Sequence, residues 1–206
     1  MPFFRFRKMR LLKLFIFLVW MLVTAFNDKA PASKWVIYKA CSLKVNGSTN
    51  VNKFDCVINN YYKPDTLSFV QYNQQDAVKM IGAMKLDINS FDCHNPMMTA
   101  DLRKTLKAKQ FPKLVIKFIT LSKYPQLKGQ QVTGWVQIDL AGVSKKFQVD
   151  YQLIPSGANA LQLKGLKQIK FSDFNIEPPR KIGGMIKTDD ELDIEFNLHI
   201  KIIKDL

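Results

Sequence analysis

The sequence predicts an all-β protein, an extended antiparallel β-barrel of about eight strands with one short helix, preceded by an N-terminal signal segment. Its clearest pattern lies at 132–153, where two runs of alternating apolar and polar residues flank a short loop that contains Gly142. Side chains of a strand point alternately to opposite faces, so each run has one apolar face and the pair is typical of an antiparallel hairpin. Strands of about 10 residues reach roughly 33 Å. A long twisted sheet with one apolar face buries that face by curling on itself into a barrel.

The composition indicates one folded domain with a basic surface. The 206 residues suffice for a barrel and a targeting segment, and 47% apolar with 23% charged residues is typical of a folded soluble domain. Of the net charge of +14, five positive charges precede residue 14, which leaves +9 for the rest. This charge favours anionic membrane surfaces or acidic partners. The lysines are scattered along polar strand faces and loops, however, so we interpret them as a solvated surface and predict no nucleic-acid partner.

The N-terminus has the form of a secretory signal. Residues 1–13 are basic and 14–26 are apolar and uncharged, as in the n-region and h-region of a signal peptide. The apolar run is shorter than the ~20 residues that a membrane-spanning helix needs. The protein is therefore expected to be exported, periplasmic or extracellular, with a signal peptide at 1–26, a linker at 27–34 and the barrel domain at 35–206.

An uncleaved anchor is the alternative for this segment. Leu11 and Leu12 lengthen the apolar run if Lys13 snorkels, which would associate the protein with the membrane through residues 11–26. The cleavage position also stays open between a site after Ala25 and a later site at Ser33.

The remaining elements follow from alternation and turn signals. The helix is expected at 98–109, with Thr99 as N-cap and Leu102 and Leu106 on one face. The loop at 172–184 contains two prolines, which a central strand excludes. Besides the hairpin, strands are expected at 35–45, 50–62, 66–72, 77–88, from Pro112 onward, at 161–171 and at 192–202.

Apolar faces from almost every strand converge on the predicted barrel interior. A barrel of eight strands is either filled by side chains or holds one slender ligand. Gly82 and Gly134 on the inward face favour free space, and Met80 and Met84 adapt to a flexible chain. The candidate lumen residues are Met80, Gly82, Met84, Gly134, Val136, Ile138, Leu140, Phe147, Val149, Tyr151, Leu192, Ile194, Phe196 and Leu198.

Several motifs, in order, resemble one family. The segment GSTNVNKFDC at 47–56 resembles the turn after the first strand of YceI-like domains, and 98–118 resembles their short helix with an aromatic-Pro strand start. FSDFNIEPP at 171–179 is similar to their DFGI-type loop. The resemblance covers 35–206. It implies an extended lipocalin-like antiparallel barrel, exported to the periplasm, that binds a long polyisoprenoid in its lumen.

Two positions depart from simple expectation. Asn175 stands where the family loop usually has Gly, but Asn tolerates a left-handed backbone and the turn is expected to survive. Leu166 and Ile169 break strict alternation around Gly165, which predicts a β-bulge there.

The three cysteines divide into an expected pair and a thiol. Cys56 lies in a predicted strand and Cys93 just before the helix, so in an oxidising compartment they are disulfide candidates. Some YceI-like sequences resemble this one in having Cys at both places, which favours the Cys56–Cys93 pairing. Cys41 shares the inward face of its strand and is expected to remain a buried thiol.

The sequence favours neither a metal site nor a catalytic one. His94 and His199 have no spaced ligand partners, so we predict no metal site and interpret both as solvent-exposed. The motifs G-x-S-x-G and H-E-x-x-H and a Gly-rich phosphate loop are absent. Asp173 is either an acid or a cap for backbone N–H groups in its turn, and the cap is the preferred interpretation.

The leading hypothesis is therefore a non-catalytic, exported carrier that needs no cofactor and whose partner is a long-chain apolar lipid of isoprenoid type. The second is a barrel with a filled core, acting as an envelope stress or interaction module through its basic surface. An enzyme acting on a bound lipid is third, since no set of residues supports it. Contact with an anionic membrane surface and a homodimer both stay open.

Overall fold

A computed structural model describes the barrel domain. Ala32–Leu206 form one compact unit, while the predicted signal peptide and most of the predicted linker lie outside the described residues. No helix in the described ranges is long and apolar enough to cross a membrane. The described residues are 32–38, 41–61, 65–71, 76–125 and 129–204.

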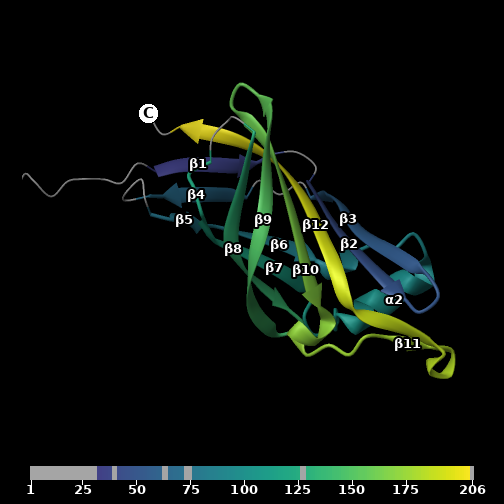
Figure 1. The fold of residues 1–206 in the computed structure, drawn as a ribbon. Coiled ribbons are helices and arrows are strands. Elements are labelled where there is room, and N and C mark those ends of the chain that lie inside the picture. The colour runs from purple at the N-terminus through teal and green to yellow at the C-terminus, as the bar shows by residue number, and fades with distance from the viewer. Residues whose placement is uncertain (1–31, 39–40, 62–64, 72–75, 126–128, 205–206) are drawn as a thin grey trace, which may run out of the picture. The chain divides into compact units, whose positions relative to one another are not determined.

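The prediction of an all-β barrel with one short helix is confirmed (Figure 1). The helix is α2 (Pro96–Thr105), and short 3₁₀ turns lie at Ile88–Ser90, Phe171–Phe174 and Ile182–Gly184. The strands are β1 (Ala32–Ile37), β2 (Cys41–Thr49), β3 (Lys53–Tyr61), β4 (Thr66–Val70), β5 (Val78–Ile81), β6 (Ala83–Asp87), β7 (Lys113–Leu121), β8 (Gln130–Leu140), β9 (Val143–Gly157), β10 (Ala160–Lys170), β11 (Arg180–Lys181) and β12 (Ile186–Lys204).

The barrel closes through β1, which is hydrogen-bonded to both β4 and β12. The closed order is β1-β4-β5-β7-β8-β9-β10-β12, with all neighbours antiparallel. The hairpin expected at 132–153 is the β8–β9 pair, in register from Gln130↔Leu153 to Leu140↔Val143. Apolar residues of one parity from these strands form a single buried core in the interior, which we call the lumen.

Two long strands each serve two successive partners along one edge. The strand β12 pairs with β10 on one side, and on the other side with β2 and then with β1. In the same way, β7 pairs with β8 on one side, and with β6 and then β5 on the other. The predicted strands 35–45 and 77–88 are each divided in two for this reason, and their prediction as single strands was wrong.

The second division falls at Gly82. A Cβ at this residue would lie 2.7 Å from the Thr66 carbonyl oxygen, so the backbone of the neighbouring strand approaches too closely for another side chain. The predicted face nevertheless continues across the break, because Val78, Met80 and Met84 are all buried.

The wall has one boundary without a strand ladder, between β3 and β6, which we call the seam. In the described part of the chain, β3 pairs only with β2 and β6 only with β7. The segment that follows β6 returns to β3, where Val57 and Asp92 exchange two backbone hydrogen bonds of 2.8 and 2.9 Å. Beside them, Cys56 and Cys93 form a disulfide, the pair expected from the sequence.

The helix begins earlier than predicted. Its N-cap is Asn95, whose Oδ1 accepts hydrogen bonds from the backbone N–H groups of Met97 and Met98. Asn is among the preferred caps, and Pro96 at the first helical position loses no hydrogen bond there. Thr99, predicted as the cap, is buried and accepts a hydrogen bond from the Cys93 backbone N–H at 3.0 Å.

The predicted bulge at Gly165 is absent from the β10–β12 ladder, which keeps one register from Ala160↔Lys201 to Lys170↔Glu191. Gly165 has another role. A Cβ there would lie 2.0 Å from Cζ of Phe196, its partner on β12, so the glycine makes room for the aromatic ring. Leu166 simply faces outward, with 62% of its surface exposed.

The loop after β10 keeps the conformation that its sequence predicts. Asn175 takes the left-handed conformation, with φ 54° and ψ 38°. The Asp173 carboxylate accepts the Lys170 backbone N–H at 2.9 Å and the ammonium group of Lys145, so its capping role is confirmed. Burial alone would raise the pKa of Asp173, but these hydrogen bonds outweigh burial and lower the pKa below its ordinary value.

Replacing Asp173 with Asn should lower the free energy of unfolding by about 1 kcal/mol at pH 7, because the cap loses its charged acceptor. Since folding lowers the pKa of this carboxyl, its stabilisation is complete above the unfolded pKa. It is lost as the pH falls through the folded value, below roughly pH 4. Urea unfolding should therefore show a difference in the free energy of unfolding between the wild-type protein and the variant that is smaller at pH 3 than at pH 7. The control is Asp150→Asn, an exposed carboxylate on β9; an equal difference for both variants would contradict the cap.

Candidate functional site

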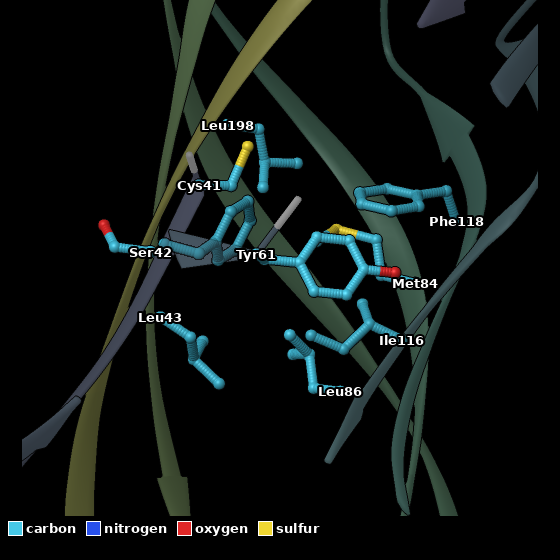
Figure 2. Close-up of a pocket in the computed structure, with 10 residues that line it drawn as sticks. Cys41, Ser42, Leu43, Tyr61, Met84, Leu86, Ile116, Phe118 and Leu198 are labelled. Carbon is cyan, nitrogen blue, oxygen red and sulfur yellow. The ribbon is translucent and has the colours of Figure 1, made fainter. Parts of the chain in front are cut away.

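The lumen contains two small cavities that adjoin each other. The first has a volume of about 10 Å³ and lies among β2, β3, β6, β7 and β12 (Figure 2). The second has about 50 Å³ and extends toward α2. Leu43 and Ile116 line both cavities, so the two are neighbours.

The linings of the two cavities are almost entirely apolar, and none of the described residues that line them is charged. The first cavity is lined by Cys41, Ser42, Leu43, Tyr61, Met84, Leu86, Ile116, Phe118, Phe196 and Leu198. The second is lined by Leu43, Val45, Phe91, Leu102, Leu106, Leu114, Ile116, Ile138, Leu140, Ile169, Phe171, Leu192 and Ile194.

The predicted lumen residues fall into two groups. Seven line a cavity: Met84, Phe196 and Leu198 the first, and Ile138, Leu140, Leu192 and Ile194 the second. The others belong to the surrounding interior without lining either cavity: Met80, Val136, Phe147, Val149 and Tyr151 are buried in the core, with Gly82 and Gly134 between neighbouring strands.

Sequence reasoning missed the contribution of β2, β7 and the helix. The sequence predicts a strand at 35–45, which contains Leu43 and Val45, and a helix with Leu102 and Leu106 on one face. The sequence did not show that these faces line the same cavity. An alternation of apolar residues in the sequence does mark the inward face of β7, at Leu114, Ile116 and Phe118.

The two inward glycines do not create free space, which corrects the argument made from them. A Cβ at Gly134 would lie 2.4 Å from the Thr120 carbonyl oxygen and 2.9 Å from the Tyr151 ring. A Cβ at Gly82 would lie 2.6 Å from the Leu67 side chain. Both glycines therefore mark close packing of neighbouring atoms rather than a cavity.

The lumen is close to filled. Pockets that hold small molecules are typically about 300–1,000 Å³, far larger than either cavity. A long chain therefore fits only where side chains move aside. Met84 is suited to this because its thioether is flexible, and the Tyr61 ring projects into the same space (Figure 2).

Tyr61 connects the two sides of the seam. Its hydroxyl donates a hydrogen bond to the Asp65 carboxylate. Burial and this hydrogen bond raise the pKa of Tyr61, opposed by a hydrogen bond with the backbone of Lys85 on β6. The phenol therefore stays protonated. Its contacts hold the ring across the seam at the C-terminal end of β3.

Tyr151 has the opposite surroundings. Only 2% of its surface is exposed, and its hydroxyl has no hydrogen-bond partner in the structure. Burial raises the pKa of this phenol, so it also remains a donor. A buried hydroxyl without a partner costs about 1–3 kcal/mol.

The remaining candidates do not assemble into a reactive site. In the ranges that the structure describes, no three His, Cys, Asp or Glu side chains lie together as metal ligands. His94 is exposed with its Nε2 3.3 Å from the Asp55 carboxylate. Cys41 is buried outside the disulfide, as predicted, and burial raises the pKa of its thiol while its sulfur accepts the His199 backbone N–H.

A larger hollow lies outside the barrel, over β8, β9 and β10, with a volume of about 550 Å³. Exposed side chains of both charge signs line it, including Lys123, Asp150 and Glu195. This mixed polar surface does not match a long apolar chain, whereas the lining of the lumen does.

Comparison with known proteins places the chain among barrels of this architecture. A family model described as the YceI-like domain matches residues 33–200. The structure of BcnA from Burkholderia cenocepacia is similar with a TM-score of 0.57 and 17% identity, covering 77% of this chain and 95% of that chain. A polyisoprenoid binding domain from Saccharophagus degradans gives 0.56 and 13% identity, covering 84% and 99%. Among curated proteins there is no match.

Replacing Gly134 with Ala should lower the free energy of unfolding by about 1–3 kcal/mol, because the new methyl group meets the Thr120 carbonyl and the Tyr151 ring. Gly129→Ala is the matched control. A Cβ there would lie 3.8 Å from the nearest atom, the Leu153 carbonyl oxygen, so the change should stay within about 0.5 kcal/mol. Urea unfolding measures both, and equal stabilities would show that the lumen has room at Gly134.

Proposed function

The chain belongs to the YceI family, and on that premise we propose that it is an exported, non-catalytic carrier that holds a polyisoprenoid or a similar long apolar chain in the barrel lumen. The observation that carries the proposal is the pair of small apolar cavities in the lumen, which share Leu43 and Ile116 in their linings. The family membership and the fold shared with a domain described as polyisoprenoid-binding support it.

The energetics favour a chain-like hydrocarbon. Each buried CH₂ group contributes about 0.8 kcal/mol, so a five-carbon isoprene unit contributes roughly 3–4 kcal/mol before the costs of ordering. Several units offset the displacement of a few lumen side chains without any hydrogen bond. Such a site selects the length and slenderness of the chain rather than its chemical detail.

The seam is the path into the lumen that we propose. Separating two paired strands breaks a ladder of backbone hydrogen bonds. Across the described residues, the seam has no such ladder, and at the C-terminal end of β3 it is spanned by Tyr61 with its hydrogen bonds. Near the middle of β3, the Cys56–Cys93 disulfide and the Val57–Asp92 bridge hold the two sides together. The first cavity lies directly behind Tyr61 and Met84, so movement of these two side chains admits a chain from the seam.

Export is supported by the pattern of the N-terminus and by the cysteines. Residues 1–13 and 14–26 have the basic and apolar character of a signal peptide, with the uncleaved anchor as the alternative. A disulfide persists in an oxidising compartment such as the periplasm. A carrier in that compartment would shield an apolar chain from water.

Full-length protein expressed in a bacterial host and recovered from the envelope should yield a prenyl lipid when it is extracted with organic solvent and examined by mass spectrometry. Ile116→Phe should reduce the lipid recovered per mole of protein at least severalfold, because the larger side chain fills the point shared by both cavities. The matched control is Ile81→Phe, where the same change is made at a residue with 54% of its surface exposed.

Extraction of no lipid from the wild-type protein would contradict the carrier function. Equal recovery from both variants would instead show that the lipid binds outside the lumen. Thermal unfolding of the two variants establishes that each is folded, since overpacking alone costs about 1–3 kcal/mol.

Replacing Cys56 and Cys93 together with Ser should lower the free energy of unfolding by about 2–4 kcal/mol, since the disulfide closes a loop with a sequence separation of 37. The same variant should take up radiolabelled farnesol faster, because the seam loses its covalent link. A reducing agent should reproduce both effects in the wild-type protein and change nothing in the variant. An unchanged uptake rate in a less stable variant would rule out the seam as the path.

A further inference from the structure

One polar atom of the lumen has no role in the packing. Among the described residues, three buried side-chain atoms lack a hydrogen-bond partner: Nε of Arg103, the hydroxyl of Tyr151 and Oδ1 of Asn197. Arg103 uses another nitrogen of its guanidinium to donate to the Phe91 carbonyl at 3.0 Å. Asn197 pairs with Lys164 and Ser42 on the outward parity of β12. Tyr151 alone of the three has the inward parity.

The position of the Tyr151 ring is fixed by the backbone around it. Tyr151 on β9 pairs with Gly165 on β10, which carries no side chain to displace the ring. Its Cε2 lies 2.9 Å from the position that a Cβ of Gly134 on β8 would take, so a side chain at Gly134 would crowd the ring. The Phe196 ring meets it edge-on, with centroids 5.7 Å apart. Two glycines and one aromatic ring thus hold the phenol in a single place inside the lumen.

A phenylalanine would fill this place equally well and bury no polar atom. The hydroxyl of Tyr151 therefore adds an unsatisfied donor to an apolar interior without any contact that repays it in the protein itself. Phe196, which touches Tyr151, also lines the first cavity. Phe196 is therefore in contact both with the first cavity and with the Tyr151 ring, so displacement of the Phe196 ring would give a chain in this cavity access toward Tyr151.

We propose that the Tyr151 hydroxyl donates a hydrogen bond to an oxygen atom of the bound lipid, so that the lumen selects an oxygenated isoprenoid over the corresponding hydrocarbon. The inference rests on the proposed function and deepens it, because it adds one polar contact to a site that otherwise recognises only shape. An alcohol and a carbonyl compound supply the same acceptor. Discrimination is strong because the hydrocarbon leaves the buried hydroxyl unpaired.

Three probes of equal chain length test the proposal: farnesol with a hydroxyl, farnesal with a carbonyl and farnesene with neither. Equilibrium dialysis against the full-length protein should show farnesol or farnesal binding about tenfold more tightly than farnesene, which corresponds to about 1.4 kcal/mol. Tyr151→Phe should remove this preference and leave the dissociation constant for farnesene unchanged. A loss confined to farnesol assigns a hydroxyl, and a loss confined to farnesal assigns a carbonyl.

Tyr124→Phe is the matched control, since it removes the hydroxyl of a tyrosine with 37% of its surface exposed and should keep the preference. Thermal unfolding adds an independent measure. Tyr151→Phe should not lower the melting temperature, whereas a fall would reveal a protein partner for the hydroxyl and overturn the proposal. The wild-type preference is measured without any variant, so equal binding of all three probes also overturns it.

The outcomes separate this inference from the function on which it rests. If the wild-type protein binds farnesene and farnesol equally, and Tyr151→Phe changes neither, the carrier function stands and the role of Tyr151 is wrong. If the wild-type protein binds none of the three probes, the carrier function fails and the inference falls with it.

Discussion

The architecture depends on the length of β12. Its 19 residues exceed the length of every neighbour, so one edge pairs with β10 while the other edge is divided between β2 and β1. Where β1 takes over from β2, the wall continues through β4 and β5 and closes by hydrogen bonds. Where β2 runs along β12, the wall continues to β3 and ends at the seam. Because of this one long strand, the barrel has one end that is closed by strand pairing and another end that is closed only at the seam.

The two ends are held together by different interactions, and this difference is the basis for proposing that the barrel opens at the seam. At the closed end, every strand boundary is a cooperative ladder, which separates only with extensive loss of backbone hydrogen bonds. At the seam, the bonds are local: one disulfide, one bridge at Val57 and the contacts of Tyr61. Local opening takes place where few such contacts must break. The seam is therefore linked covalently at one point, and along the rest of its length it is held by a few hydrogen bonds that can break independently of one another.

Alternation in the sequence predicted which face of each strand is buried, because parity is a local property. For that reason, Ile138 and Leu192 are buried on the face that the alternation predicts. Adjacency in space is not local: nothing near Leu43 or Ile116 in the sequence shows that these residues line the same two cavities. The helix start was misplaced because Thr99 is also a good cap, and only the tertiary contact with the Cys93 backbone shows that its hydroxyl is used elsewhere.

The glycines show the same limit in a sharper form. Gly134 and Gly165 both lie on inward faces, and a sequence alone does not reveal whether the missing side chain leaves a void or is replaced by a neighbour. In the structure, an aromatic ring occupies the place of a side chain at Gly47, Gly142 and Gly165, whereas at Gly134 the nearest atom is the Thr120 carbonyl oxygen. Close packing and apparent emptiness thus have the same sequence signature, and only the partner residue distinguishes them.

This way of filling the interior reconciles a nearly solid core with a binding role. A lumen filled by backbone or by β-branched side chains has few alternative packings, because those side chains have few rotamers. Here the space next to the cavities is filled by the rings of Tyr61, Phe118 and Phe196 and by Met84, which change the volume available to a ligand by rotating about their own bonds. The capacity of the barrel is then set by rotamers rather than by the positions of its strands. The same apolar residues form the core when these side chains turn inward and form the binding surface when they turn aside.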